Sequence, residues 1–305
     1  MQKPSSLFFN AVSCVDHAMI VDGKIVGGSV LPNIIITGNV DPKESVVVDF
    51  STLKKSIKAI IDHPEYGFDH KLWVDPSDPN TTLDTSIDGR IRVKTRWVEF
   101  EGPADAVKFV NLKRGVDEDM AELLTEKLRE EYPDVDITAH VSWKSDDAHT
   151  YGSTTAFFTY VHGLKDSTSR GCNNLAHGHL SYIEVIADPL IARMFSQQLA
   201  AELNGIIFVN RENVIRETDK SITFGYQNTY CGRGMFRMKL DTTQHKVAIL
   251  GGETTIECLV EEVTSQYSDD ALRAMGITHI MISEGLQKGA VREVPALLTT
   301  NGGKV

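Results

Sequence analysis

The sequence is poor in cysteine, and its four cysteines, Cys14, Cys172, Cys231 and Cys258, form no Cys-x-x-Cys pair. This spacing argues against a disulfide framework or a structural zinc knuckle, and reduced thiols favour the cytosol. Long apolar runs are also missing, and the first residues lead into no signal-peptide core. We therefore expect a cytoplasmic protein that makes no contact with a membrane.

Basic clusters are equally scarce. The 305 residues carry a net charge of −11, and no basic run is longer than Lys54-Lys55. A nucleic-acid backbone is therefore not expected as a partner, although local cations could still hold one small anionic molecule. A hydrophobic content of 41% and a charged content of 24% are typical of a globular protein, and the length allows two domains.

The most informative motif is His177-Gly178-His179, which leads into an apolar run. In a strand, residues two apart face the same side, so the two imidazoles would point the same way. His162 ends an apolar segment just upstream and could complete an open tripodal zinc site. A His-x-His pair also occurs on ordinary exposed strands, and Cys172 could be a plain buried thiol. Their combination within about twenty residues favours a metal site.

The order of predicted elements repeats along the chain, as strand, strand, helix, hairpin, helix, strand, strand. The first half predicts strands over 7–12, 31–40, 90–101, 106–112 and 135–143, with helices after Ser51 and over 117–132. The second half predicts strands over 157–162, 182–188, 221–230, 235–240 and 278–283, with helices over 190–204 and 254–267. Residues 75–88 are expected to form a loop, and 144–150 a linker. We expect two α+β domains, 1–147 and 148–305.

Four motifs together resemble the 6-pyruvoyl-tetrahydropterin synthase / 6-carboxy-tetrahydropterin synthase family. They are Cys-Asn-Asn-x-x-His-Gly-His, Phe-Thr-Tyr-Val-His, Val-Val-Asp-Phe-x-x-Leu-Lys and Phe-Asp-His. The resemblance covers nearly the whole chain as two tandem copies. It implies two T-fold domains, with antiparallel sheets carrying helix pairs on one face, that assemble into a barrel.

The resemblance also implies the roles of individual residues. It assigns zinc binding to His162, His177 and His179, and catalysis to Cys172 with an Asp-His pair. It assigns contact with the pterin to two glutamates, Glu284 and Glu257.

The two halves depart from the family pattern in complementary ways. In the first half the zinc positions are predicted to fall on Ser13 and near residues 29–31, and the pterin glutamate position on Trp143, yet the pair Asp69-His70 is kept. In the second half the Asp-His position falls near Gly205. We therefore expect domain 1–147 to lend Asp69 and His70 to a site whose zinc ligands, Cys172 and glutamates come from domain 148–305. The alternatives are that the first half is a structural prop, or that His245 takes the place of His70.

The implied activity is a zinc-dependent lyase that acts on 7,8-dihydroneopterin triphosphate. Of the two family products we favour 6-carboxy-5,6,7,8-tetrahydropterin, on the path to 7-deazaguanine (queuosine-type) bases. The alternatives are 6-pyruvoyl-tetrahydropterin, or a zinc-containing pterin- or purine-binding protein without turnover. Arg170, Lys165 and Arg233 are candidate partners of the triphosphate. We expect a homo-oligomer with an even number of T-fold units per ring, because exposed sheet edges tend to associate.

Overall fold

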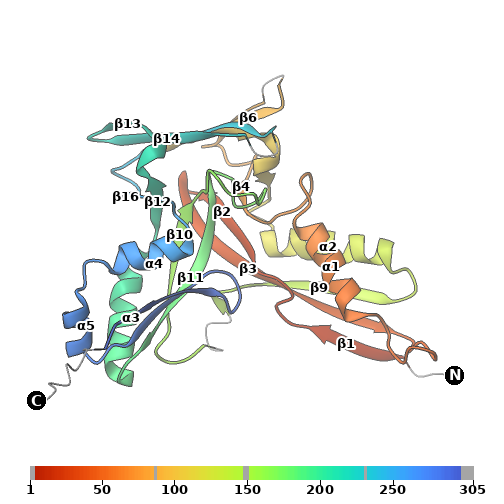
Figure 1. The fold of residues 1–305 in the computed structure, drawn as a ribbon. Coiled ribbons are helices and arrows are strands. Elements are labelled where there is room, and N and C mark those ends of the chain that lie inside the picture. The colour runs from red at the N-terminus through yellow and green to blue at the C-terminus, as the bar shows by residue number, and fades with distance from the viewer. Residues whose placement is uncertain (1–3, 86–87, 147–150, 230–231, 297–305) are drawn as a thin grey trace, which may run out of the picture.

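The computed structural model describes residues 4–85, 88–146, 151–229 and 232–296, so the predicted domain boundary at 147 and 148 lies outside the described residues. The chain forms an α+β molecule with three arms (Figure 1). Strand β1 (Ser5–Phe9) lies in one lower arm and helix α5 (Asp269–Ala274) in the other. None of the helices in the described ranges combines the length and apolar character that a bilayer span requires.

The bounds of the elements are as follows. The first half contains β1 (Ser5–Phe9), β2 (Val15–Val21), β3 (Lys24–Gly38), α1 (Phe50–Ile61), β4 (Lys71–Val74), β5 (Thr82–Thr85), β6 (Arg90–Lys94), β7 (Val98–Pro103), the 3-10 turn η1 (Ala104–Ala106), β8 (Val107–Phe109), α2 (Val116–Glu131) and β9 (Asp136–Trp143). The second half contains β10 (Ala156–His162), β11 (His177–Ile186), α3 (Pro189–Leu203), β12 (Ile206–Asn210), the 3-10 turn η3 (Arg211–Asn213), β13 (Val214–Thr218), β14 (Ser221–Asn228), β15 (Gly234–Asp241), β16 (Lys246–Leu250), α4 (Ile256–Thr264), α5 (Asp269–Ala274), β17 (His279–Ser283) and β18 (Gly289–Glu293).

Each lower arm is built on one sheet. The N-terminal sheet has the order β8-β4-β2-β3-β9, with β1 also paired to β3. The C-terminal sheet has the order β16-β12-β10-β11-β17, extended by β18. In the N-terminal sheet β2 and β3 are antiparallel, and β4 and β8 run parallel to β2. In the C-terminal sheet β10 and β11 are antiparallel, and β12 and β16 run parallel to β10. The two halves therefore repeat one strand order.

The upper arm is a sheet that both halves build together, called here the shared sheet. Its order is β13-β14-β15-β7-β6-β5, and β7 of the first half pairs antiparallel with β15 of the second. The apolar face of this sheet covers a core that combines side chains from both halves, among them Phe100 and Phe236. The halves are thus joined by backbone hydrogen bonds and by a common core.

The sheet registers correct the predicted alignment of the halves. Ala18 lies between Gly27 and Leu72 in the N-terminal sheet, as Val161 lies between Gly178 and Ile207 in the C-terminal sheet. The counterparts of the three histidines are therefore these residues of the first half: Met19, Val26 and Gly28. They are not Ser13 and residues 29–31, because the strand that aligns with β10 is β2, which the sequence did not predict.

Several predicted strands also differ from the observed ones. The strand expected over 90–101 is the hairpin of β6 and β7, which turns at Thr95. The Thr95 hydroxyl stabilises this turn, since it accepts from the Val98 amide and donates to the carbonyl of Gly23. The segment over 106–112 pairs, through β8, with β4. Part of the loop expected over 75–88 forms the edge strand β5.

The helices cover the outer faces of the two lower sheets, as their apolar spacing predicts. Helix α1 buries an apolar stripe of Leu53, Ile57, Ile60 and Ile61. Its N-cap is Asp49, whose carboxylate accepts from the Thr52 amide, and not Ser51. Helix α2 lies beside α1 and packs against β9, and α3 packs against β10 and β11.

The two halves meet where β2 and β3 contact β10 and β11, a contact called here the seam. Gly27 and Gly178 face one another at its centre. A Cβ on Gly178 would lie 2.6 Å from the Cα of Gly27, and a Cβ on Gly27 would lie 2.1 Å from the carbonyl oxygen of Tyr160. Only glycine allows the backbones to approach this closely.

Replacing Gly27 by alanine is expected to destabilise the protein strongly, by about 3 kcal/mol or more, because backbone atoms cannot move aside for the new methyl group. Chemical denaturation monitored by fluorescence measures this change. Gly252→Ala is the matched control, since no atom lies within 4 Å of the position of its Cβ. Equal stability of the two variants would contradict the seam described here.

Candidate metal and active site

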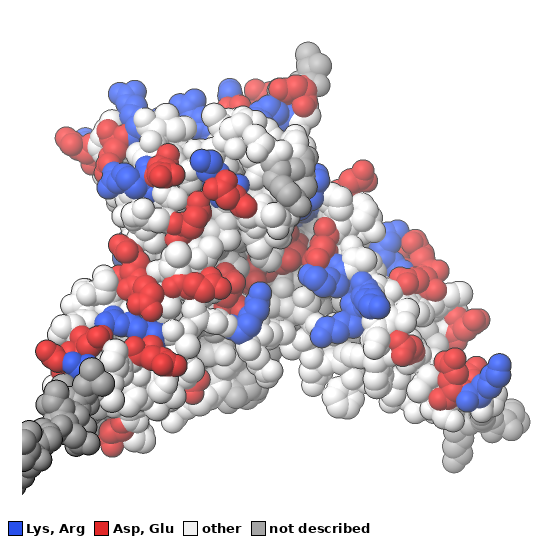
Figure 2. All heavy atoms as spheres, viewed as in Figure 1, with Lys and Arg blue, Asp and Glu red and all other residues white. Residues whose placement is uncertain are grey.

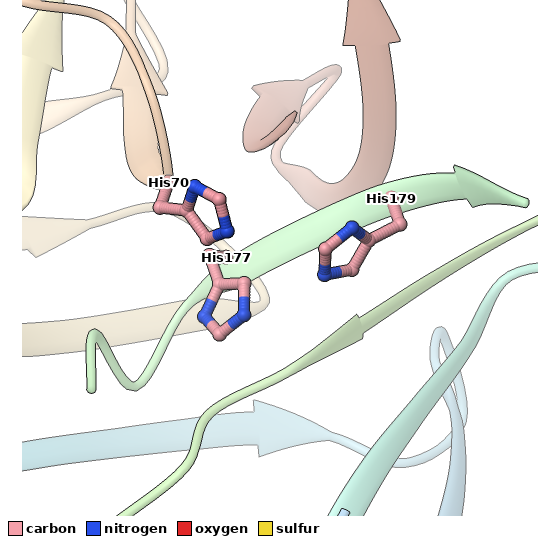
Figure 3. A group of neighbouring side chains, drawn as sticks. All are labelled: His70, His177 and His179. Atoms are coloured by element: carbon pink, nitrogen blue, oxygen red, sulfur yellow. The ribbon is translucent and has the colours of Figure 1, made fainter. Parts of the chain in front are cut away.

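Four histidines converge beside the seam. His177 and His179 lie on β11, His162 ends β10, and His70 comes from the turn before β4 of the first half. Figure 3 shows His177 and His179 on one strand, with the ring of His70 above that of His177. The His162 and His177 rings are 4.3 Å apart, and the His70 and His177 rings 5.0 Å.

Two of these rings are held by hydrogen bonds at Nδ1, and a third has a carboxylate next to its Nδ1. Nδ1 of His162 lies 2.7 Å from the carbonyl oxygen of Thr254, and Nδ1 of His177 lies 3.0 Å from that of Asn174. A carbonyl only accepts, so each Nδ1 carries the proton and each Nε2 has a free lone pair. Nδ1 of His179 lies 3.2 Å from a carboxylate oxygen of Asp16. Such anchoring of the second nitrogen is typical of metal-binding histidines.

The residues fit a divalent metal ion. Nε2 of His162 and Nε2 of His179 lie 3.0 Å apart, which places two acceptor nitrogens face to face. Two nitrogen ligands of one tetrahedral zinc ion would lie about 3.3 Å apart. Burial, together with the neighbouring imidazoles, holds the pKa of His162 and of His177 well below the usual range, so both rings are neutral, as ligation requires.

The possible ligand atoms form two overlapping groups within the described residues. Those of His70, His177 and His179 lie within 4.8 Å of one another, and so do those of His162, His179 and Glu284. Of the three predicted ligands, His177 belongs to the first group, His162 to the second, and His179 to both. The structure thus brings the predicted ligands together and adds His70 and Glu284 at the border of the cluster.

Asp69, His70 and Cys172 form a chain of polar contacts across the seam. Nδ1 of His70 is 2.7 Å from a carboxylate oxygen of Asp69. Burial alone would lower the pKa of His70, but the charge and hydrogen bond of Asp69 raise it well above the usual value. Partial burial would raise the pKa of Cys172, but its hydrogen bond to His70 and the charge of that ring outweigh burial and lower it. The thiol is therefore placed for activation as a thiolate.

His70 adopts a left-handed backbone conformation, with φ of 54°. Its amide donates to the carbonyl of Asp16 at 2.6 Å, just as the amide of Gly205 donates to the carbonyl of Thr159 at 2.8 Å in the second half. Gly205 is also left-handed, with φ of 77°. The second half has the residue that this conformation favours, whereas the first half keeps a histidine at a cost of about 1 kcal/mol or more.

A pocket of about 330 Å³ opens onto His70 and Cys172. Five cationic side chains line it, Lys58, Lys71, Arg170, Arg233 and Lys288, together with the carboxylates of Asp62, Asp69 and Asp105. Elsewhere, on the face that Figure 2 shows, lysine and arginine are interspersed with aspartate and glutamate. Cationic side chains therefore outnumber carboxylates in this pocket, beside the site of an otherwise acidic protein.

The arginines of the pocket are oriented by one carboxylate. Arg170 and Arg233 both bind Asp105, the latter at 2.8 Å. Burial and the nearby charge of Lys108 lower the pKa of Lys71 to about 8. A bound anion would stabilise the ammonium of Lys71 and raise its pKa again.

The other predicted site residues lie in different settings. Glu284 follows β17, and a carboxylate oxygen is 3.8 Å from Nε2 of His179. Glu257 lies in the first turn of α4 with an exposed side chain and is not part of the pocket lining. His245 donates from Nδ1 to the Asp241 carbonyl and accepts at Nε2 from the Ile25 amide, so both nitrogens serve the backbone.

Sequence reasoning missed two buried side chains that hold the site from the first half. Asp16 contacts His179, and the ammonium of Lys144 donates to the carbonyls of Leu180 and Gly285 at 2.7 and 2.9 Å. Asp16 sits in an apolar run, where a charged residue signals a buried partner. Lys144 gave no such signal, because it occurs in a polar segment that reads as a linker.

No family model matches the sequence, and no curated protein matches it. The structure is similar over 46% of the chain to 6-pyruvoyl tetrahydropterin synthase from Plasmodium vivax, covering 92% of that chain at 14% identity with a TM-score of 0.36. The match to the 6-pyruvoyl tetrahydropterin synthase from Plasmodium falciparum covers 47% of this chain and 99% of that chain, at 12% identity with a TM-score of 0.33. The match to an uncharacterized protein from Wolinella succinogenes covers 47% of this chain and 99% of that chain, at 15% identity with a TM-score of 0.29. These TM-scores are too low to assign a function, which is argued below from the residues of this chain.

Alkylation of Cys172 by iodoacetamide is expected to become fast at a pH below the ordinary thiol pKa, because His70 stabilises the thiolate. In His70→Ala the Cys172 pKa should rise, so that alkylation at neutral pH slows by about tenfold or more. Peptide mass spectrometry resolves each cysteine. Cys14, whose pKa burial and Asp16 raise, is the internal control and should react slowly in both proteins. An unchanged rate at Cys172 would remove His70 as its partner.

Proposed function

We propose that the protein is a metal-dependent lyase of the tetrahydropterin synthase type, with zinc as the metal and 7,8-dihydroneopterin triphosphate as substrate. The observation that carries the proposal is the meeting of Cys172 with Asp69 and His70 beside three buried, anchored histidines. Among the products we favour 6-carboxy-5,6,7,8-tetrahydropterin, formed with acetaldehyde and triphosphate by uptake of water. The chain is proposed to consist of two tandem T-fold units.

In this proposal His162, His177 and His179 hold the ion through Nε2. A zinc ion bound there supplies Lewis acidity toward the hydroxyls of the substrate side chain. Charge balance supports the assignment. The rings of His162 and His177 are neutral, and the two positive charges of a divalent cation would be offset by the nearby carboxylates of Asp16 and Glu284.

The proton transfers are assigned to the residues that cross the seam. The thiolate of Cys172 removes a proton from a side-chain carbon of the substrate, and His70 passes protons to and from the sulfur. Asp69 orients the imidazole and stabilises its charged form. Glu284 accepts hydrogen bonds from the N–H groups of the pterin ring, which fixes the ring relative to the thiol.

The cationic pocket is proposed to hold the triphosphate. Arg170 and Arg233 are aligned by Asp105, and Lys71 gains a counterion when an anion binds. Lys165, also considered from the sequence, is not part of the pocket lining. His245 is not given a catalytic role, because both of its nitrogens are engaged with the backbone.

The proposal predicts turnover by the zinc-loaded protein. Incubated with 7,8-dihydroneopterin triphosphate, it should give a tetrahydropterin whose mass distinguishes the carboxy from the pyruvoyl product. Cys172→Ala should lose at least about a thousandfold in rate, because it removes the thiolate that the proposal assigns as the base. Cys258→Ala is the control, since this cysteine is exposed, and it should keep full activity.

Absence of product from the zinc-loaded wild type would reject the lyase. Tight binding of the pterin without turnover, measured by fluorescence, would then support the alternative of a zinc-containing pterin- or purine-binding protein.

His70→Gly separates catalysis from stability. Glycine relieves the left-handed backbone, so the free energy of unfolding should stay within about 1 kcal/mol of the wild type. Turnover should fall by about 10²–10⁴-fold, because the proton relay is lost. Gly205→Ala is the mirror control: nothing lies within 4 Å of the position of its Cβ, so it should lose about 1 kcal/mol and keep its turnover. Full activity of His70→Gly would support the view that the first half is only a structural prop.

A further inference from the structure

Asp16, the second residue of β2, occupies a position that links the two parts of the site. It is 4% exposed. Its amide donates to a carboxylate oxygen of Asp69 at 2.9 Å, and its carbonyl accepts from the amide of His70 at 2.6 Å. Its own carboxylate reaches in the other direction and lies 3.2 Å from Nδ1 of His179. One residue of the first half therefore contacts both the acid–imidazole pair and a proposed metal ligand.

The orientation of this carboxylate is fixed by other donors. Oδ1 of Asp16 accepts from the hydroxyl of Ser29 at 2.5 Å and from the thiol of Cys14 at 3.4 Å. The Ser29 hydroxyl in turn accepts from the amide of Leu180 at 2.9 Å, next to His179. Because Oδ1 is engaged, Oδ2 is the oxygen that remains for the imidazole.

His179 differs from the other two proposed ligands in the source of its anchor. His162 and His177 are held by backbone carbonyls of their own half, at Thr254 and Asn174. These carbonyls are present whatever the side chains are. His179 depends on a side chain that comes from the other half of the chain and carries a full charge.

We infer that Asp16 is the positioning residue of the metal site: its carboxylate accepts the Nδ1 proton of His179 and so directs the Nε2 lone pair at the ion. The inference rests on the proposed metal site. A carboxylate in this position fixes the tautomer and ring orientation of a ligand and increases its basicity. The position of Asp16 gives the first half a role in metal binding, although that half has Met19, Val26 and Gly28 in place of the three histidines.

Asp16→Asn tests the inference. Ser29 and Cys14 donate toward the amide oxygen, so the amide nitrogen faces His179 and donates to Nδ1. The proton of the ring then moves to Nε2, where it blocks the lone pair. Zinc affinity, measured by competition with a chromophoric chelator, should fall by about 10–100-fold. His177→Ala, which removes a ligand, is the reference for a larger loss.

Asp75→Asn is the matched control. Asp75 is a buried aspartate of the same half, and its carboxylate accepts from the amides of Ser77 and Leu112, away from the metal ligands. This variant should keep wild-type zinc affinity even if it is less stable. The absorption spectrum of the Co²⁺-loaded protein gives a second readout, which should change in Asp16→Asn at saturating metal and stay unchanged in Asp75→Asn.

The outcomes separate this inference from the proposed function. Tight zinc binding by the wild type, with equal affinity and spectrum in Asp16→Asn, overturns the role of Asp16 and leaves the proposed function standing. A wild type that binds no zinc overturns the metal site itself. If Asp16→Asn does not fold, Ser29→Ala keeps the charge and removes one donor; a loss of about three- to tenfold in affinity supports the inference, and an unchanged affinity rejects it.

Discussion

The contact between β3 and β11 at Gly27 and Gly178 is the constraint on which the site depends. Because neither residue has a side chain, the two strands approach at backbone distance, and groups from separate halves come within hydrogen-bonding reach. Leu180 can then donate to Ser29, and His179 lies against Asp16. A seam wider by one methyl group would separate the charged and polar groups of one half from the imidazoles of the other.

The two halves contribute different chemistry to this contact. The second half supplies the histidine cluster, the thiol and Glu284, and its turn before β12 has a glycine. The first half supplies the acid–imidazole pair, and the ammonium of Lys144, whose contact with the Gly285 carbonyl fixes the backbone next to Glu284. The strained backbone at His70 shows that the sequence tolerates a local cost there, which is common where a side chain has a function.

The sequence predicts the amphipathic helices well, because their apolar stripes are buried on one side only. It also predicts that Asp69 and His70 belong with Cys172, through the missing Asp-His of the second half. Strand β2 escapes prediction because Asp16 and His17 interrupt its apolar pattern. These polar side chains are buried against partners distant in the sequence: His17 stacks on Trp73 at 3.5 Å. The partner of a buried charge is set by the packing of the halves, which local patterns do not contain.

The antiparallel pairing of β7 with β15 has a consequence for the symmetry of the chain. Corresponding strands that pair antiparallel, and corresponding glycines that face each other, place an approximate dyad between the halves. Two halves related in this way face opposite directions, so the chain presents two similar sets of outer sheet edges that are related by the same dyad.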